Sequence, residues 1–246
     1  MRRAAAVLLL LLLAPAAHAA GLYEGQAITT GTDGRTRPAA LAACLAQVLA
    51  KVSGNPALLD DPRVAALGPA APGLLAGLAY LDRMGDIPHH DEQGTRDRPY
   101  DLLARFEPSG IDAALLGLGE IPWLVNRDRP RVFADIAIAP RGGGPPVPLL
   151  ADTDAGERHR AALLSAADRF GIPVLLRPSD GPPPSAPAVL RGRIAWQDDG
   201  WAAAWTLAWA GQQRAWTVHG VGFDEAYRNA LAGTAAALSG HGPPKS

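Results

Sequence analysis

The densest group of side chains able to bind a metal ion is the run of two histidines, an aspartate and a glutamate at positions 89–92. Histidine nitrogens and carboxylate oxygens are ordinary zinc ligands. A zinc site also needs ligands from other parts of the chain at fixed geometry, and the sequence signals none elsewhere. We therefore interpret residues 89–92 as part of a solvated loop, and we expect neither a bound metal nor a cofactor.

The common catalytic and phosphate-binding patterns are missing from this sequence. No serine stands in a Gly-x-Ser-x-Gly motif, and no His-Glu-x-x-His occurs. The glycines of 140–146 lie among prolines, which lack the backbone donors that a phosphate needs, so this stretch is interpreted as a linker. The single cysteine, Cys44, lies between Leu41 and Leu45 on a predicted helix and is interpreted as a buried thiol without a disulfide partner.

Asp135 stands out because it interrupts an apolar strand predicted over residues 131–139. An acid in such a place is a candidate functional carboxyl with a raised pKa. The more ordinary interpretation, which we favour, is that its side chain lies on the wetter face of the sheet or pairs with a nearby arginine.

Three tryptophans, Trp201, Trp205 and Trp209, form the best candidate binding surface. Their even spacing along a predicted strand places all three on one face, and aromatic rings stack on sugars, peptides or partner side chains. A two-layer domain also needs large residues between its sheet and its helix. Core packing is the favoured interpretation, and the binding surface remains open beside it.

The elements that carry these tryptophans form the most regular part of the sequence. Mostly large apolar residues alternate with small or polar ones over 190–196, 201–209 and 214–218, with short turns at 198–200 and 211–212. This pattern predicts an antiparallel three-strand meander. A final amphipathic helix over 224–238 is expected to cover the sheet.

The first half of the chain is organised around one periodic helix, predicted over 37–53. Thr36 is the expected N-cap and Gly54 the expected stop, while Gln47 and Lys51 fall outside the apolar face. The other elements expected here are strands over 22–28 and 100–106, a short helix over 62–67, a helix or strand over 74–81, an exposed loop over 85–98, and a second helix capped by Ser109.

The middle of the chain combines the 131–139 strand with a helix over 157–170 and a short strand over 172–176. Leu163, Leu164, Ala167 and Phe170 are expected to face inward from this helix, with Gly171 as its stop.

After Met1 the chain has two arginines, an apolar run over 4–13 and the small-x-small pattern of Ala17, His18 and Ala19. We predict a signal peptide over 1–19, cleaved to leave a periplasmic protein. No later stretch is long and apolar enough to span a bilayer. The formal net charge of −1 gives no electrostatic reason to expect nucleic acid or an anionic membrane as partner.

Five short segments, 22–24, 46–55, 105–108, 121–123 and 189–193, resemble the bacterial envelope family known as domain of unknown function 2066. The Gln-Val-Leu-Ala-Lys-Val-Ser-Gly-Asn run within 46–55 is the most specific of them. The resemblance implies a signal-bearing proteobacterial protein with no established activity, so it supplies no catalytic residues.

Together these patterns predict an α+β architecture in two small lobes, each an antiparallel or mixed sheet covered by helices. The expected division is an N-terminal lobe over 20–139, a Gly/Pro-rich linker over 140–151, a C-terminal lobe over 152–240 and a frayed tail over 241–246. We expect a non-catalytic module that binds another envelope protein or assembles at the envelope. The alternative is a binder of a small ligand or glycan in the cleft between the lobes, and a hydrolase stands third.

Overall fold

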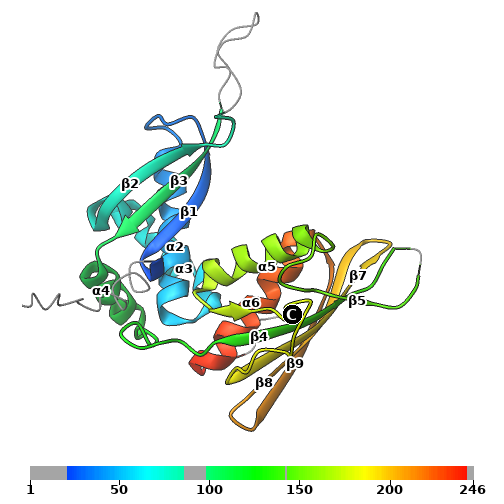
Figure 1. Cartoon of the computed structure of the whole chain (residues 1–246). Coiled ribbons are helices and arrows are strands. Elements are labelled where there is room, and N and C mark those ends of the chain that lie inside the picture. Colours follow the sequence, from blue (N-terminus) through cyan, green and yellow to red (C-terminus); the bar gives the residue numbers. More distant parts are fainter. Residues whose placement is uncertain (1–20, 86–97, 142, 243–246) are drawn as a thin grey trace, which may run out of the picture.

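The computed structural model describes residues 21–85, 98–141 and 143–242. The predicted signal peptide over 1–19 and the metal-ligand types at 89–92 lie outside these residues. Within them the chain has the predicted α+β architecture, with two separate sheets and helices packed on each (Figure 1).

The N-terminal lobe is a three-stranded antiparallel sheet with helices on one face. Its strands β1 (Glu24–Thr30), β2 (Leu75–Asp82) and β3 (Pro99–Phe106) stand in the order β1-β3-β2. Residues 74–81, left open as helix or strand, are therefore mostly strand. Helix α2 (Arg37–Ser53) packs on the sheet, joined by η1 (Pro56–Asp60), α3 (Pro62–Leu67), η2 (Gly68–Leu74) and α4 (Pro108–Leu118).

Helix α2 has the predicted bounds, and its apolar stripe is buried as expected from its periodicity. Gly54 ends it in the left-handed region at φ 74°, a conformation that favours glycine. Two details of the prediction are wrong. Thr36 makes no capping bond, because its hydroxyl donates to Thr30 O and accepts from Thr29. Gln47 and Lys51 are buried, because both reach the backbone of β1.

The C-terminal lobe is a six-stranded mixed sheet. Strands β5 (Val147–Pro148), β4 (Val132–Ile138), β7 (Ala188–Gln197), β8 (Gly200–Trp209) and β9 (Gln212–Val221) follow one another, and β6 (Val174–Leu175) also pairs with β4. The predicted meander is confirmed as β7, β8 and β9. Because β4 runs parallel to β7, the predicted division at residue 139 places this strand with the wrong sheet.

One face of the large sheet is covered by α5 (Glu157–Phe170) and α6 (Phe223–Ser239). Leu163 and Phe170 lie on the buried face of α5 as predicted, whereas Leu164 on the same helix is 49% exposed. The helix after β3 also differs from the prediction at its start, since its N-cap is Glu107 and Ser109 lies inside it.

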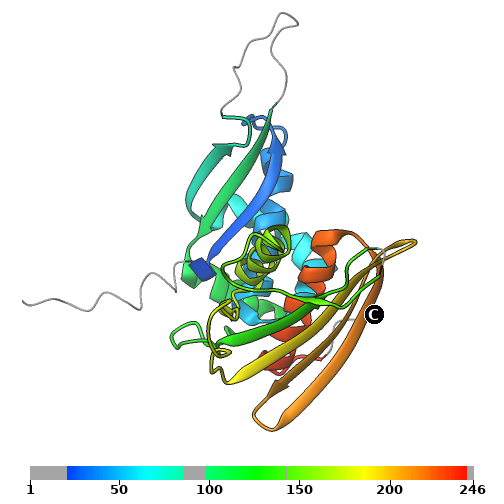
Figure 2. The ribbon, with the colours of Figure 1, turned by 45° about the vertical axis from the view of Figure 1, so that its right-hand side comes forward.

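The two lobes meet through helices. Figures 1 and 2 place α5 and α6 between the large sheet and the N-terminal lobe, and α2 contacts α5 directly. Backbone bonds add to this junction, since Trp123 N–H donates to Val52 O at 2.8 Å. The lobe boundary is thus a packed interface.

Candidate functional site

The tryptophan row of β8 faces α5 and α6. Trp205 is 1% exposed and belongs to the core, while Trp201 and Trp209 are partly buried and pack against the same core. The register places Trp205 opposite Gly192 on β7 and Trp216 on β9. A Cβ at Gly192 would overlap the Trp205 ring, so this glycine leaves the space in which the indole lies.

An aromatic cluster surrounds the outer end of this row. The His159 imidazole on α5 meets the rings of Trp201, Phe223 and Tyr227 edge to face, with centroids 4.9 to 5.9 Å apart. Its Nδ1 lies 2.6 Å from the Tyr227 hydroxyl. Half-exposed Trp196 completes the cluster, and the Arg141 guanidinium lies 4.5 Å from its ring centroid.

His159 makes stability depend on pH, because burial lowers its pKa below the ordinary value of 6.5. The unfolded chain then binds a proton more readily than the native state. The contribution of His159 is therefore full above about pH 6.5 and is lost as the pH falls below it. We expect the free energy of unfolding from urea titrations to decrease between about pH 7 and pH 5, and to decrease less in His159→Phe.

Comparing wild type with His159→Phe isolates the contribution of His159 to this pH dependence, because other histidines such as His219 and His241 are present in both proteins. The same pH dependence in wild type and His159→Phe would contradict the assignment.

Asp135 lies on the opposite face of the large sheet, turned away from the helices. The register pairs it with Arg191 on β7, and its Oδ2 is 3.9 Å from Arg191 Nε. Both side chains are more than half exposed. This is the ordinary arrangement expected for Asp135, an ion pair on a solvated face, which contributes little to stability.

A cleft of about 940 Å³ opens between the lobes, where α2 and the following turns face the ends of α5 and α6. Its apolar lining includes Ala43, Ala46, Leu59 and Phe170. Its polar lining includes Asn55, Asp60, Arg169, Arg228, Asn229 and His241.

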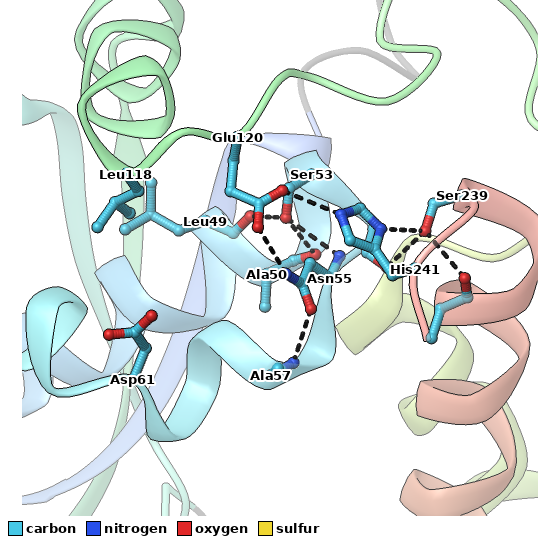
Figure 3. A network of polar contacts seen from close by, with 12 residues as sticks. Leu49, Ala50, Ser53, Asn55, Ala57, Asp61, Leu118, Glu120, Ser239 and His241 are labelled. Carbon is cyan, nitrogen blue, oxygen red and sulfur yellow. Dashed lines mark hydrogen bonds and ion pairs between the residues drawn. The ribbon is translucent and has the colours of Figure 1, made fainter. Parts of the chain in front are cut away.

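A chain of polar contacts crosses one end of this cleft (Figure 3). Asn55 Nδ2 donates to Glu120 Oε1 at 2.7 Å, and Glu120 Oε2 lies 3.0 Å from His241 Nε2. His241 Nδ1 is 2.7 Å from Ser239 Oγ, which donates to Gly54 O at 2.9 Å. His241, assigned by the sequence to a frayed tail, is thus held against the N-terminal lobe.

Glu120, His241 and Ser239 have the residue types of a hydrolase triad, but their surroundings oppose that chemistry. Ser239 ends α6, where the helix dipole is negative and carbonyl oxygens of Gly54 and Ala236 point at its hydroxyl. An oxyanion needs donors aimed at it, and here acceptors surround the serine. The contacts instead tie the end of α6 to the N-terminal lobe.

Two buried cations lie at the lobe junction, and one of them, Arg129, donates to backbone carbonyls of both lobes. Arg129, 2% exposed, donates to the oxygens of Lys51, Val52, Trp123, Phe170 and Gly171 and lies over the Trp123 ring at 4.4 Å. It therefore caps the C-terminal ends of α2 and α5 together. Lys51 Nζ donates to Gly21 O and Glu24 O, at 3.1 and 2.9 Å.

At the β1 edge of the three-stranded sheet, one side-chain amide pairs with the backbone of a single residue. Gln47 Oε1 accepts from Gln26 N–H at 2.8 Å, and Gln47 Nε2 donates to Gln26 O at 3.4 Å. The amide thus occupies the place of a neighbouring strand. Gly25 lets β1 approach α2 this closely, because a Cβ there would lie 2.6 Å from Cys44 O.

The opposite edge, β2, is open. Within the described residues no chain pairs with its outer side. Its sequence from Leu75 to Leu81 is free of charge and proline, and Leu78 and Leu81 are 37% and 54% exposed. A hollow of about 420 Å³ crosses the three strands beside it, with Gly77, Ala79, Leu103 and Arg105 in its lining.

The remaining candidates are the cysteine and the potential metal ligands. Cys44 is fully buried, and burial raises its pKa to about 12, so the reactive thiolate does not form at neutral pH. The described part of the chain brings no three potential metal ligands together. None of its helices is both long and apolar enough to span a bilayer.

Residues 16–123 match the model of a family described as a domain of unknown function, DUF8605. The resemblance to domain of unknown function 2066 is therefore wrong, because the matching family is a different one. The match ends just before β4, so it covers the three-stranded sheet and its helices but none of the large sheet. No curated protein and no solved structure matches the chain.

Sequence reasoning missed the residues at the lobe junction. Arg129, Lys51, Glu120 and His241 are single polar residues without a motif, and Glu120 and His241 lie 121 positions apart. The only local signal was Lys51 in an otherwise apolar helix end, which the pattern assigned to the solvent side.

Proposed function

We propose that the protein is an exported, non-catalytic module that binds another envelope protein by pairing the edge of β2 with an extended segment of that partner. The observation that carries the proposal is the unequal treatment of the two edges of one sheet. On the β1 edge, side chains bond to the backbone of Gln26, Glu24 and Thr30, whereas among the described residues no strand pairs with the outer backbone groups of β2.

The side chains around β2 suit an apolar, extended partner. Proteins commonly protect edge strands with lysine, proline or inward-pointing charge, and none of these occurs between Leu75 and Leu81. Exposed Leu81 lies on the strand itself and exposed Ile28 on β1 of the same sheet. The hollow lined by Gly77 and Ala79 can accept alternate side chains of an added strand, as in other cases of strand addition.

Site-specific photocrosslinking in cells tests this proposal. Probes are placed one at a time at Ala76, Ala79 and Leu81 on β2, with Gln213 on the outer strand β9 as a matched edge control. We expect one discrete adduct from the β2 probes and none from Gln213. Mapped by mass spectrometry, the partner residues should advance along one extended segment as the probe moves along β2.

Either of two results would overturn strand addition. One is the absence of a discrete adduct from β2 when a control pair crosslinks under the same conditions. The other is a set of partner residues scattered over a surface, which would indicate another mode of contact. Introducing lysine at Ala79 and Leu81 together should abolish the adduct and leave the far-ultraviolet circular dichroism unchanged.

A further inference from the structure

Arg169 differs from the two buried cations at the lobe junction. It lies in the last turn of α5, is half-buried and lines the cleft between the lobes. Arg129 and Lys51 donate to several carbonyls each, but Arg169 makes no hydrogen bond to any residue in the described part of the chain. Its Nε is shielded from solvent and has no partner; the same is true of Arg129 Nε, but there the two terminal nitrogens are hydrogen-bonded. A half-buried guanidinium in this condition is costly unless something else pairs with it.

The protein charges around Arg169 do not supply that partner. Burial and the positive charge of Arg228 lower its pKa, and Glu225 acts in the other direction. Glu225 is itself engaged, since its Oε2 lies 2.7 Å from an Arg228 terminal nitrogen. On the opposite wall Asp61 is paired with Arg63 at 2.7 Å, and Asp60 is exposed. The wall formed by α5 and α6 therefore carries two guanidinium groups for one carboxylate.

Asn229 supplies a further donor on this wall. Asn229 Oδ1 accepts from Trp216 Nε1 at 3.0 Å, which leaves its Nδ2 amide free to donate. Asn229, Arg169 and Arg228 all line the same cleft. Arginine presents planar, paired donors that match the two oxygens of a carboxylate or phosphate.

We propose that Arg169, with Arg228 and Asn229, forms a binding site in the inter-lobe cleft for a small molecule bearing a carboxylate or phosphate group. The terminal nitrogens of Arg169 contact the anion, because its Nε is enclosed by protein. This site is separate from the β2 edge and does not depend on strand addition.

The test uses the purified full chain with inorganic phosphate and with succinate, each titrated at constant ionic strength by exchange against sodium chloride. In wild type we expect a rise in Tm that saturates with at least one of the two anions. Arg169→Gln should abolish the rise. Arg169→Lys keeps the charge but loses the paired donors, so its half-saturation point should move up by at least about tenfold.

The matched control is Arg158→Gln, which removes the same charge from an exposed position on the same helix and should respond as wild type does. An equal rise in wild type and Arg169→Gln would overturn the proposal, as would the absence of saturation with both anions. If Arg169→Gln fails to fold, Arg169→Lys and Arg228→Gln decide, and a wild-type response in both would overturn it. A response to only one anion distinguishes a phosphate-bearing from a carboxylate-bearing ligand.

Discussion

Replacing Arg129 with methionine is expected to lower the free energy of unfolding by about 3 to 5 kcal/mol, since hydrogen bonds to charged groups are worth about 1.5–3 kcal/mol each. Methionine keeps most of the apolar bulk but leaves carbonyls of α2 and α5 without a donor in a buried place. The loss falls on both helices at once, because Arg129 is the group that joins their C-terminal ends. Equilibrium urea denaturation followed by circular dichroism measures it.

Two further variants separate the bonds of Arg129 from its charge. Arg131→Met removes the same charge from an exposed position two residues away. The urea denaturation midpoint of this variant should stay close to that of wild type. Arg129→Lys keeps the charge but has one nitrogen to serve carbonyls that lie in several directions, so it should recover only part of the stability. A small effect of Arg129→Met, equal to that of Arg131→Met, would show that water satisfies these carbonyls.

The parts of the fold that the sequence predicts well are those in which neighbouring residues decide the outcome. Helices α2 and α5 have the predicted bounds because each combines apolar spacing with a left-handed glycine just past its C-terminal end. The meander follows from strict alternation with two tight turns. The burial of Trp205 follows from the same alternation, since a covering helix was also predictable.

The resemblance to domain of unknown function 2066 was wrong because its most specific residues form a common type of helix end. Its most specific run, within 46–55, encodes a helix end. Ser53 Oγ donates to Leu49 O and accepts from Asn55 N–H, Gly54 takes the left-handed conformation, and Asn55 Oδ1 accepts from Ala57 N–H to begin η1. Such a run is set by local geometry, so it recurs wherever a helix ends in this way and is weak evidence of family.

The lobe junction and the placement of β4 depend on residues far apart in the sequence. The pattern of β4 identifies a strand but not its neighbour, and only its pairing with β7 assigns it to the large sheet. Lys51, Arg129 and Arg169 look like ordinary solvated cations in the sequence. Their burial arises because the ends of α2 and α5 meet there, which periodicity does not reveal. Of the three, only Arg129 donates to the carbonyls of those helix ends.

The second large effect is expected at Trp205, where replacement by alanine should cost about 3 to 5 kcal/mol, the range for truncating a buried aromatic side chain. The cavity cannot close easily, because the facing position on β7 is Gly192 and offers no side chain to fill it. Tyr227 on α6 would lose the ring against which it packs, at a centroid distance of 6.2 Å. Urea denaturation followed by circular dichroism avoids interference from the other tryptophans.

The matched control for Trp205 is Trp196→Ala, because Trp196 lies on the neighbouring strand but is 45% exposed. Its loss should cost no more than about 1 kcal/mol, the scale of an exposed aromatic and cation–π contact. If Trp205→Ala and Trp196→Ala shifted the urea denaturation midpoint equally, the buried position of Trp205 would not account for its contribution to stability. A folded Trp205→Ala protein that retains wild-type stability would return the tryptophan row to consideration as a binding surface. If only Trp205→Ala strongly lowers the free energy of unfolding, a binding role is left to Trp196 and the partly exposed Trp201. The Arg141 guanidinium lies over the rings of both.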